Sequence, residues 1–477
     1  MRPLEALLIL GAASAIIRGS FLSDLAWLPW TPLMPIAIAV LLALHLFFEG
    51  WRPQMMSAYA VIIILLLLAV IPVPAVGGFP GQLAGGMGLG LLAAAGCLCV
   101  LRPVIQTPSP TGAFAVGTTV TPLLDDAAVD GPVFRVWYPA KPRSGRGFAP
   151  YLNETRPWPG FNKRHARLGR TQSMLDAALI DTPARLPILV FFPGWGGRPS
   201  QNTVLLQDLA SHGYIVAAPD AWDRRAYPHD TAAAADLATP LAFDSDEAAA
   251  LSLRVGARNA PRLAWLARHL ADRLAALDAA EPAGRFTGRL ELDKIGILGF
   301  SFGGSVAIQA AMADPRFRAV ANLDGQVFTD AYLRGFSQPY LLLSEPVWTD
   351  VQLRSPNPWI RRAAVSALED ESRVEAFLAR WGGIRLIIDG VAHENFKDAP
   401  LLQTLRRPGG AIDPRRARLI VTTFLLAFFD HALRSAPRPV PDCAQGDYPD
   451  IRLQIWPRPT VTENHMTPTS TTQALAP

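Results

Sequence analysis

The spacing of apolar residues divides the chain into two parts. Before residue 104, apolar side chains run almost unbroken in four segments, at about 4–17, 26–48, 57–77 and 81–101. The second and third segments are long enough to cross a bilayer core of about 30 Å, which takes about 20 helical residues. The fourth is rich in Gly and Ala, which let helices pack closely. The pattern therefore predicts a helical transmembrane region of about four helices over residues 1–103.

The first segment is short and follows a basic residue, features that a cleaved signal peptide shares. Because further apolar segments follow directly, we interpret it as a first span, with cleavage as the alternative. With four spans, Arg2, Arg52 and Arg102 fall on one side of the membrane. Only Arg18 falls on the other side, and cytoplasmic loops carry the excess of basic residues. The sequence thus predicts an integral protein of a bacterial inner membrane whose large domain faces the cytoplasm; a cleaved first segment would reverse that side.

Beyond residue 116, short apolar runs alternate with segments of helical spacing. Two strand patterns flank a turn at Asp130-Gly131, which is typical of a β-hairpin. Six later runs have the length and composition of strands buried on both faces: LPILVFFPG, YIVAAPD, KIGILGF, FRAVANLDG, PYLLLSEP and GIRLIIDGVAH. Helical patterns follow several of them, including a long one at Ala248–Ala279. This alternation predicts an α/β domain over residues 116–435, with a mostly parallel sheet flanked by helices.

Proline-containing segments bound this domain on both sides. The stretch PVIQTPSPTGAF predicts a semi-rigid linker at 104–115. Residues 436–477 are dominated by Pro and Thr, with low charge and no visible period, so we expect a mostly disordered tail.

Charge and cysteine content narrow the function classes. The net charge is only +4, and no dense basic run with interleaved aromatic residues is present, so nucleic acid is not expected as a partner. Three cysteines cannot form a disulfide framework.

One corner of the domain carries a serine between small residues. Gly299-Phe300-Ser301-Phe302-Gly303 lies between a predicted strand and a predicted helix, as a nucleophile elbow requires. Larger side chains two positions from the serine would clash with the adjacent strand and helix. The turn leaves the hydroxyl exposed beside a helix N-terminus, whose partial positive charge favours a developing oxyanion. Ser301 is therefore the candidate nucleophile, and a structural serine in a tight turn is the alternative.

The serine needs a base and an acid. Of eight histidines, only His393 follows a predicted buried strand late in the chain, and the order serine, acid, histidine is the one expected for this fold. Asp324 ends the strand directly after the serine helix, and Glu345 ends the next strand, where many enzymes of this fold carry their acid. Either carboxylate could hold the imidazole nitrogen that faces away from the serine, so the spacing leaves both open.

The developing oxyanion needs two backbone N–H donors. Phe302, directly after the serine, would supply one. The second would come from the loop FFPGWGGRPS, whose glycines let backbone amides approach a ligand closely. This points to Trp195, and a glycine turn with a core tryptophan is the alternative. No HExxH motif or metal-ligand cluster is visible, so neither a metal nor a cofactor is expected.

Six stretches together resemble the platelet-activating-factor acetylhydrolase family of α/β-hydrolases, of the secreted and type II intracellular kind: LPILVFFPGWGG, LASHGYIVAAPDAWDRRA, DKIGILGFSFGGSVAIQA, AVANLDG, PYLLLSEP and IIDGVAHENFKD. They cover roughly residues 116–435. The resemblance implies the α/β-hydrolase fold and Asp324, rather than Glu345, as the acid. It also implies the roles given above to the other four candidate residues.

The sequence departs from the family pattern at two places beside the site. Pro193-Gly194 stands where the family usually has His-Gly in the oxyanion loop. Gly325-Gln326 follows the acid where the family has a bulky aromatic residue, which changes the wall of the acyl pocket. The acyl-chain preference is therefore left open by the sequence.

Together, the motifs and the resemblance predict a membrane-anchored, metal-independent serine ester hydrolase. Its substrates would be short or oxidised acyl esters of phospholipids, or other apolar esters, since an anchor keeps the site near lipid. A broad carboxylesterase or polyester hydrolase is the alternative enzyme, and acyl transfer to an alcohol is a third reaction. A non-catalytic membrane scaffold or sensor is the alternative of another class. A missing triad member would favour it, and here all three positions are filled.

Overall fold

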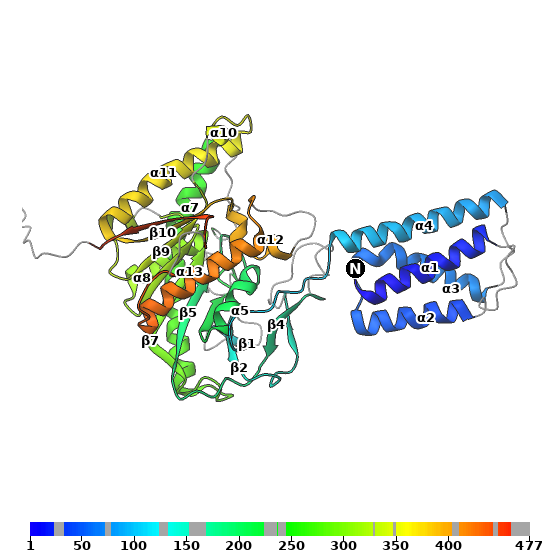
Figure 1. Cartoon of the computed structure of the whole chain (residues 1–477), viewed down its shortest axis with the longest axis horizontal. Helices are drawn as coiled ribbons and strands as arrows, with labels where there is room; N and C mark the ends of the chain where they lie inside the picture. The colour runs from blue at the N-terminus through cyan, green and yellow to red at the C-terminus, as the bar shows by residue number, and fades with distance from the viewer. Residues whose placement is uncertain are drawn as a thin grey trace, which may run out of the picture.

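The computed structural model describes residues 1–22, 33–71, 78–123, 132–151, 168–223, 236, 245–327, 330–346, 350–402, 410–441 and 447–458. Helices of the first 101 residues form a bundle, and a wide sheet with helices on both faces forms the remainder (Figure 1). The turn expected at Asp130-Gly131 lies outside the described residues, although the two strands that it joins are described and pair antiparallel.

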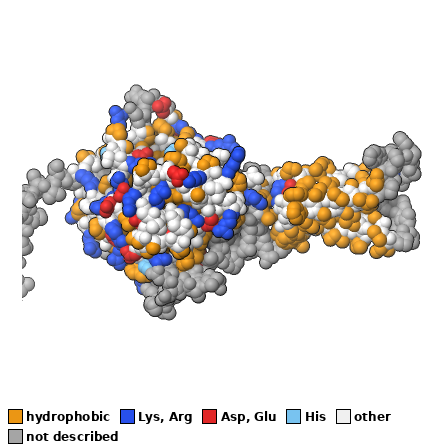
Figure 2. Space-filling model, turned by 90° about the horizontal axis from the view of Figure 1, so that it is seen from below, with side chains coloured by type: hydrophobic (Ala, Val, Ile, Leu, Met, Phe, Trp, Pro, Cys, Tyr) orange, Lys and Arg blue, Asp and Glu red, His pale blue; other side chains and the backbone are white. Residues whose placement is uncertain are grey.

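The N-terminal helices pack against one another along their lengths (Figure 1). Their bounds are α1 Pro3–Phe21, α2 Leu33–Leu44, a π-helical turn η1 His45–Glu49, a 3₁₀ turn η2 Pro53–Met55, α3 Met56–Val70 and α4 Gly78–Leu101. Three stretches are long and apolar enough to cross a membrane: Pro3–Phe21, Pro53–Val70 and Pro80–Leu101. The apolar helix Leu33–Glu49 is shorter, and residues 23–32 before it are outside the described part of the chain. The outer surface of the bundle is almost wholly apolar (Figure 2), which suits contact with lipid.

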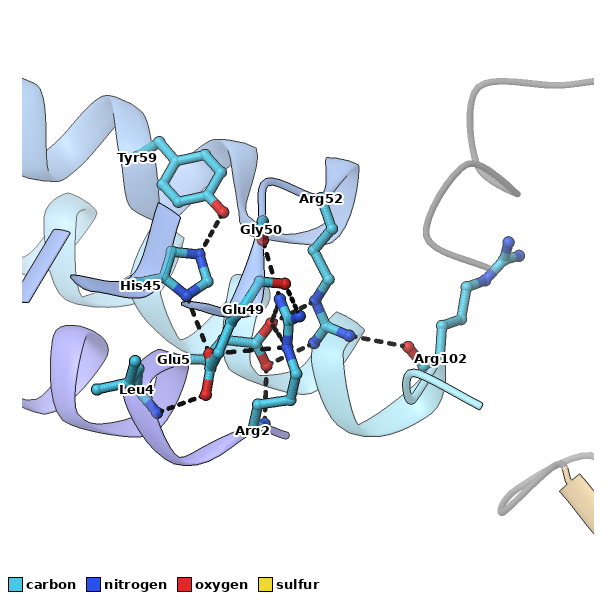
Figure 3. A network of polar contacts seen from close by, with 9 residues as sticks. All are labelled: Arg2, Leu4, Glu5, His45, Glu49, Gly50, Arg52, Tyr59 and Arg102. Carbon is cyan, nitrogen blue, oxygen red and sulfur yellow. Dashed lines mark hydrogen bonds and ion pairs between the residues drawn. The ribbon is translucent and has the colours of Figure 1, made fainter. Parts of the chain in front are cut away.

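One end of this bundle contains a buried polar network made of Arg2, Glu5, His45, Glu49, Arg52 and Tyr59 (Figure 3). Glu5 forms an ion pair of 2.7 Å with Arg52, and neither side chain is exposed. His45 lies between the Glu49 carboxylate, at 3.0 Å from Nδ1, and the Tyr59 hydroxyl, at 2.7 Å from Nε2. Buried charges are tolerated only when they are paired, so the network ties the beginning of α1 to the loop between α2 and α3.

The strands beyond the bundle form one 11-stranded sheet in the order β11-β10-β9-β8-β7-β5-β6-β2-β1-β4-β3. Their bounds are β1 Ala115–Pro122, β2 Val133–Ala140, β3 Phe148–Pro150, β4 Arg170–Leu175, β5 Leu186–Phe192, β6 Ile215–Pro219, β7 Leu290–Phe300, β8 Phe317–Leu323, β9 Tyr340–Ser344, β10 Gly383–Ile388 and β11 Ile451–Trp456. All neighbouring pairs from β10 across to β6 are parallel. The predicted fold, a mostly parallel sheet flanked by helices, is confirmed.

Helices cover both faces of the parallel strands. One face is packed by α7 Asp246–Ala280, α8 Phe302–Ala313 and α11 Pro358–Trp381, and the other by α5 Thr203–Ser211 and α13 Pro414–Arg434. Along β5, Ile188 and Val190 pack into the first layer, whereas Leu189 and Phe191 pack into the second. Successive side chains of a strand point to opposite faces, so a strand buried on both faces is apolar throughout.

The order of the strands places a topological switch point at β5. From β5 the chain moves to β6 on one side, and it later returns to β7 on the other side of β5. The loops that leave the carboxyl ends of β5 and β7 therefore run apart, and ligands of open α/β sheets bind at such a switch point. These two loops carry Gly194-Trp195 and Ser301.

The strand β11 lies within residues 436–477, where the sequence predicted a mostly disordered tail and gave no indication of a strand. β11 pairs antiparallel with β10 along its whole length, from Ile451 to Trp456. Asp450, just before it, accepts a backbone bond on its carbonyl from Asp389 and forms an ion pair with Arg416. The Pro and Thr residues around it gave no strand signal, yet these six residues pair with β10 and cover that edge of the sheet.

The linker is attached to the domain that follows it. Its Thr107 is buried, and the Thr107 hydroxyl accepts a hydrogen bond of 3.1 Å from the Gln207 side chain in α5. Farther on, the Thr111 backbone N–H donates to Asp208 Oδ1 at 2.6 Å. These contacts hold the linker along α5, within a few residues of the end of α4.

Candidate active site

The candidate nucleophile lies in a strained turn between β7 and α8. Ser301 has φ 54° and ψ −126°, a backbone conformation that residues other than glycine rarely adopt. Its backbone N–H donates to the Leu323 carbonyl of the neighbouring strand at 2.8 Å, which fixes the turn. The helix α8 starts at Phe302, so the serine lies directly before a helix N-terminus.

The glycines around the serine are required by close backbone contacts. A Cβ on Gly299 would lie 2.0 Å from the Gly303 carbonyl oxygen, and a Cβ on Gly303 would lie 2.1 Å from the Phe192 carbonyl oxygen. A Cβ on Gly325 would lie 2.1 Å from the Ser301 carbonyl oxygen. The glycine after Asp324, a departure from the family pattern, thus packs directly beneath the serine turn.

The structure brings Ser301, His393 and Asp324 together. His393 Nε2 lies 2.9 Å from Ser301 Oγ, and His393 Nδ1 lies 2.6 Å from Asp324 Oδ2. The three residues follow β7, β8 and β10, whose carboxyl ends share one edge of the sheet. Phe300, the last residue of β7, supports the imidazole, with ring centroids 4.7 Å apart. The arrangement can relay a proton from the serine hydroxyl to the imidazole.

Glu345, which the spacing left open as the acid, contacts the other two residues differently. Its carboxylate accepts a hydrogen bond of 3.0 Å from the backbone N–H of His393, not from the imidazole. Its own backbone N–H donates to Asp324 Oδ1 at 2.9 Å. Asp324 therefore contacts the ring nitrogen of His393, whereas Glu345 contacts the His393 backbone and the other carboxylate oxygen of Asp324. Spacing along the sequence gave no signal for this contact.

The loop that carries His393 is held by buried side chains that the sequence did not indicate. Asn395 Oδ1 accepts hydrogen bonds from the backbone of Ala392, at 2.9 Å, and of Gly410, at 2.7 Å. Asn202 donates to the Phe396 carbonyl at 2.7 Å. Asparagines in loops are common, and only the fold shows that these two fix the loop of the candidate base His393.

The electrostatic surroundings favour a basic imidazole. Burial by itself would lower the pKa of His393, but the hydrogen bond and negative charge of Asp324 outweigh it, and the charge of Glu345 adds to them. The pKa of His393 is therefore raised above 6.5, its usual value. A more basic imidazole is a better acceptor for the serine proton.

The two candidate oxyanion donors belong to backbone segments that both adjoin Ser301. A Cβ on Gly194 would come within 3.1 Å of Ser301 Cβ, so the loop after β5 packs against the nucleophile. The rings of Trp195 and Phe302 contact each other edge to face, with centroids 4.8 Å apart, and Trp222 packs against both. The aromatic cluster therefore connects the two backbone segments that would supply the N–H groups.

Among the described residues, one group has the composition of a metal site, namely Glu5, His45 and Glu49 in the helix bundle. Its carboxylates are already engaged: Glu5 pairs with Arg52 and Arg2, each at 2.7 Å. Glu49 accepts a hydrogen bond from the Leu4 backbone N–H and contacts His45. Two arginines balance the two carboxylates, so the donor set fits an ion-pair network better than a cation site.

Two family models match the part of the chain that forms the sheet domain. The family model described as "Platelet-activating factor acetylhydrolase, isoform II" matches residues 100–240 and 274–436, more than half of the chain. The dienelactone hydrolase family model matches residues 176–332. A ferulic acid esterase from Streptomyces cinnamoneus superposes with a TM-score of 0.52 at 24% identity, covering 73% of this chain and 99% of the esterase, a likeness that concerns the fold alone.

Curated relatives are similar at low identity. Platelet-activating factor acetylhydrolase of Cavia porcellus is 25% identical over 53% of this chain and 59% of its own length. The Bos taurus protein of the same name is 24% identical, over 61% of this chain and 68% of its own length. A probable 1-alkyl-2-acetylglycerophosphocholine esterase of Arthroderma benhamiae is 26% identical, over 38% and 46%. The chain thus spans about three fifths of the first of these relatives.

Proposed function

Because the chain belongs to the platelet-activating factor acetylhydrolase, isoform II family, we propose that it is a metal-independent serine ester hydrolase. The observation that carries the proposal is the continuous hydrogen-bonded series Ser301 Oγ, His393, Asp324 Oδ2, with contacts of 2.9 and 2.6 Å. The elbow conformation of Ser301 supports it independently, and the raised pKa of His393 follows from the same contact with Asp324.

The reaction would proceed in two steps. Ser301 Oγ attacks the ester carbonyl carbon while His393 Nε2 takes the hydroxyl proton, and Asp324 stabilises the resulting imidazolium. The tetrahedral intermediate collapses, the C–O bond to the alcohol breaks, and the alcohol leaves with the proton from His393. Water, deprotonated by His393, then hydrolyses the acyl-serine ester and regenerates the free hydroxyl.

The oxyanion of each tetrahedral intermediate would be held by the backbone N–H groups of Phe302 and Trp195. Phe302 begins α8 directly after Ser301, so its N–H lies at the helix N-terminus, where the partial positive charge favours an oxyanion. Gly194 packs against Ser301, which brings the backbone of the next residue, Trp195, close to the serine. Two such donors are worth several kcal/mol to the transition state.

The substrate class that fits best is a lipid-like ester, with short or oxidised acyl esters of phospholipids first. The names of the curated relatives support this choice, and so do three helices that are long and apolar enough to span a membrane. We further propose that these helices anchor the chain in a bacterial inner membrane. Arg2 and Arg52 meet at the same end of the bundle, near the Arg102 carbonyl, which favours a cytoplasmic catalytic domain.

Ester turnover by the full chain in lipid nanodiscs tests the proposal. p-Nitrophenyl esters from acetyl to dodecanoyl, together with a phospholipid bearing an sn-2 acetyl group, are compared for wild type, Ser301→Ala and the matched control Ser372→Ala. Ser372 is an exposed serine on α11. We expect turnover that survives a chelator, persists in the control and falls by at least about 10³-fold in Ser301→Ala. A folded wild type without turnover on any ester would contradict the proposal and favour the scaffold alternative.

A further inference from the structure

Glu345 contacts both the candidate acid Asp324 and the candidate base His393. The strand order β10-β9-β8 puts the end of β9 between His393, which follows β10, and Asp324, which follows β8. Glu345 uses this position twice: its backbone N–H donates to Asp324 Oδ1 at 2.9 Å, and its Oε2 accepts from the His393 backbone N–H at 3.0 Å. One residue therefore contacts both the acid and the base.

The first contact restricts the Asp324 carboxylate. Oδ2 faces the imidazole at 2.6 Å, and the bond from Glu345 to Oδ1 fixes the rotation of the carboxylate about its Cβ–Cγ bond. Asp324 also has a positive φ of 58°, and its backbone N–H donates to the Leu343 carbonyl at 2.8 Å. The acid is thus held from β9 at two places.

The second contact restricts the base. His393 opens the short 3₁₀ helix His393–Phe396, and the first N–H groups of a helix have no partner within it. Glu345 accepts this N–H and fixes the backbone from which the imidazole projects. The ring itself is about 40% exposed, so the backbone anchor is needed to keep Nε2 aimed at Ser301. Small displacements of a reacting group can cost about 10²-fold in rate.

Glu345 also places a second negative charge beside the imidazole. Asp324 Oδ2 contacts Nδ1, and the charge of Lys397 has the opposite electrostatic effect on His393 to that of the two carboxylates. Removing the charge of Glu345 while keeping its oxygen would therefore make the imidazole less basic without moving it.

We propose that Glu345 is a positioning residue that holds the Asp324 carboxylate and the His393 backbone in the orientation that places the imidazole between Asp324 and Ser301. The inference rests on the proposed function, because it assigns Glu345 a role in ester hydrolysis. It differs from a purely structural helix cap, which would act on stability alone.

The test compares Glu345→Gln and Glu345→Ala in the full chain in nanodiscs, with Glu375→Gln, an exposed residue of α11, as the control. The glutamine oxygen can still accept the His393 N–H, so we expect kcat within about threefold of wild type and an acid limb of kcat/KM displaced to lower pH. The alanine variant loses the acceptor as well, and we expect kcat to fall by about 10–100-fold with little change in KM.

A second readout does not require turnover. The imidazole of His393 is titrated by NMR in chains labelled with ¹⁵N-histidine, its signal being assigned by its loss in His393→Ala. A lower titration midpoint in Glu345→Gln than in wild type and in Glu375→Gln supports the inference even if no ester is turned over, in which case only the proposed function fails. An unchanged midpoint in Glu345→Gln, or a wild-type kcat in Glu345→Ala, overturns it.

Discussion

His393 Nε2 lies 2.9 Å from Ser301 Oγ, although 92 positions separate the two residues in the chain. Their contact depends on the parallel order of the strands: β7 and β10 end at the same edge of the sheet, with β8 and β9 between them. The imidazole crosses this gap because the loop after β10 folds back over the end of β7, where the Phe300 ring supports it. Substitutions in either loop are expected to lower ester turnover more than they lower the free energy of unfolding.

The raised pKa of His393 predicts the pH dependence of turnover. A protonated imidazole cannot accept the serine proton, so activity is lost as the pH falls through the pKa of His393. That pKa is raised, and the midpoint of the acid limb of kcat/KM is expected above 6.5. Asp324→Asn removes the charge and the strongest hydrogen bond that raise the pKa, so its limb moves to lower pH and kcat falls by about 10⁴-fold. A limb below 6.5 in wild type would contradict this assignment of the base.

Substitution of Gly303 is expected to disrupt the elbow. The added Cβ of Gly303→Ala would lie 2.1 Å from the Phe192 carbonyl oxygen, and backbone cannot move aside as a flexible side chain can. We expect the free energy of unfolding to fall by about 1–3 kcal/mol, as in other overpacked sites, and ester turnover to be lost. The control is Gly86→Ala in α4, where nothing lies within 4 Å of the new methyl group. Thermal unfolding and turnover equal to wild type in Gly303→Ala would show that the turn is not constrained.

The polar network of the bundle predicts strong coupling between Glu5 and Arg52. Glu5→Ala leaves the fully buried Arg52 guanidinium without its main partner, and we expect a loss of about 3–5 kcal/mol. Replacing both, as Glu5→Gln with Arg52→Met, removes the unpaired charge and should restore part of that loss. Thermal unfolding in detergent measures both, with Ser14→Ala as a control, because Ser14 is exposed and its hydroxyl bonds within its own helix, to the Leu10 carbonyl. A loss in the double variant equal to the sum of the losses in Glu5→Gln and Arg52→Met, each measured singly, would mean that the two residues are not coupled.

The strand β11 predicts how far the C-terminus can be shortened. A chain ending at residue 441 lacks β11 and exposes the edge of β10, so we expect a lower melting temperature and aggregation at high concentration. A chain ending at residue 458 keeps β11 and serves as the control. Light scattering and thermal unfolding compare the two. Equal behaviour of the two truncations would show that the sheet does not need this edge strand.

Most of the sheet could be predicted because its physical signal is local. Parallel strands covered on both faces must be apolar throughout, so β5 and the second half of β7, from Ile295 to Phe300, are visible as continuous apolar runs. The elbow was visible for a related reason: the contact of Gly303 with Phe192 excludes larger side chains and leaves a pattern in the sequence. β11 was missed although its residues, IRLQIW, alternate between apolar and polar, because the run is only six residues long and lies within a segment rich in proline.

The choice between Asp324 and Glu345 could not be made from spacing, because both end neighbouring strands at the same edge of the sheet. Which carboxylate faces the ring nitrogen depends on the direction of each side chain beyond its strand, and no periodicity encodes that direction. The family resemblance favoured Asp324, and in the structure Asp324 Oδ2 is the oxygen at 2.6 Å from His393 Nδ1. The second contact of Glu345, to the His393 backbone, depends on how the loop after β10 folds against the end of β9.

The most direct test of a serine mechanism is to locate the covalent adduct. The full chain in nanodiscs is treated with a fluorophosphonate, which reacts with activated serines, and the modified peptide is identified by mass spectrometry. We predict one adduct per chain on the peptide that contains Ser301, formed faster at pH 8 than at pH 5 and absent from Ser301→Ala. A folded chain that forms no adduct, or an adduct that persists in Ser301→Ala, would contradict the account.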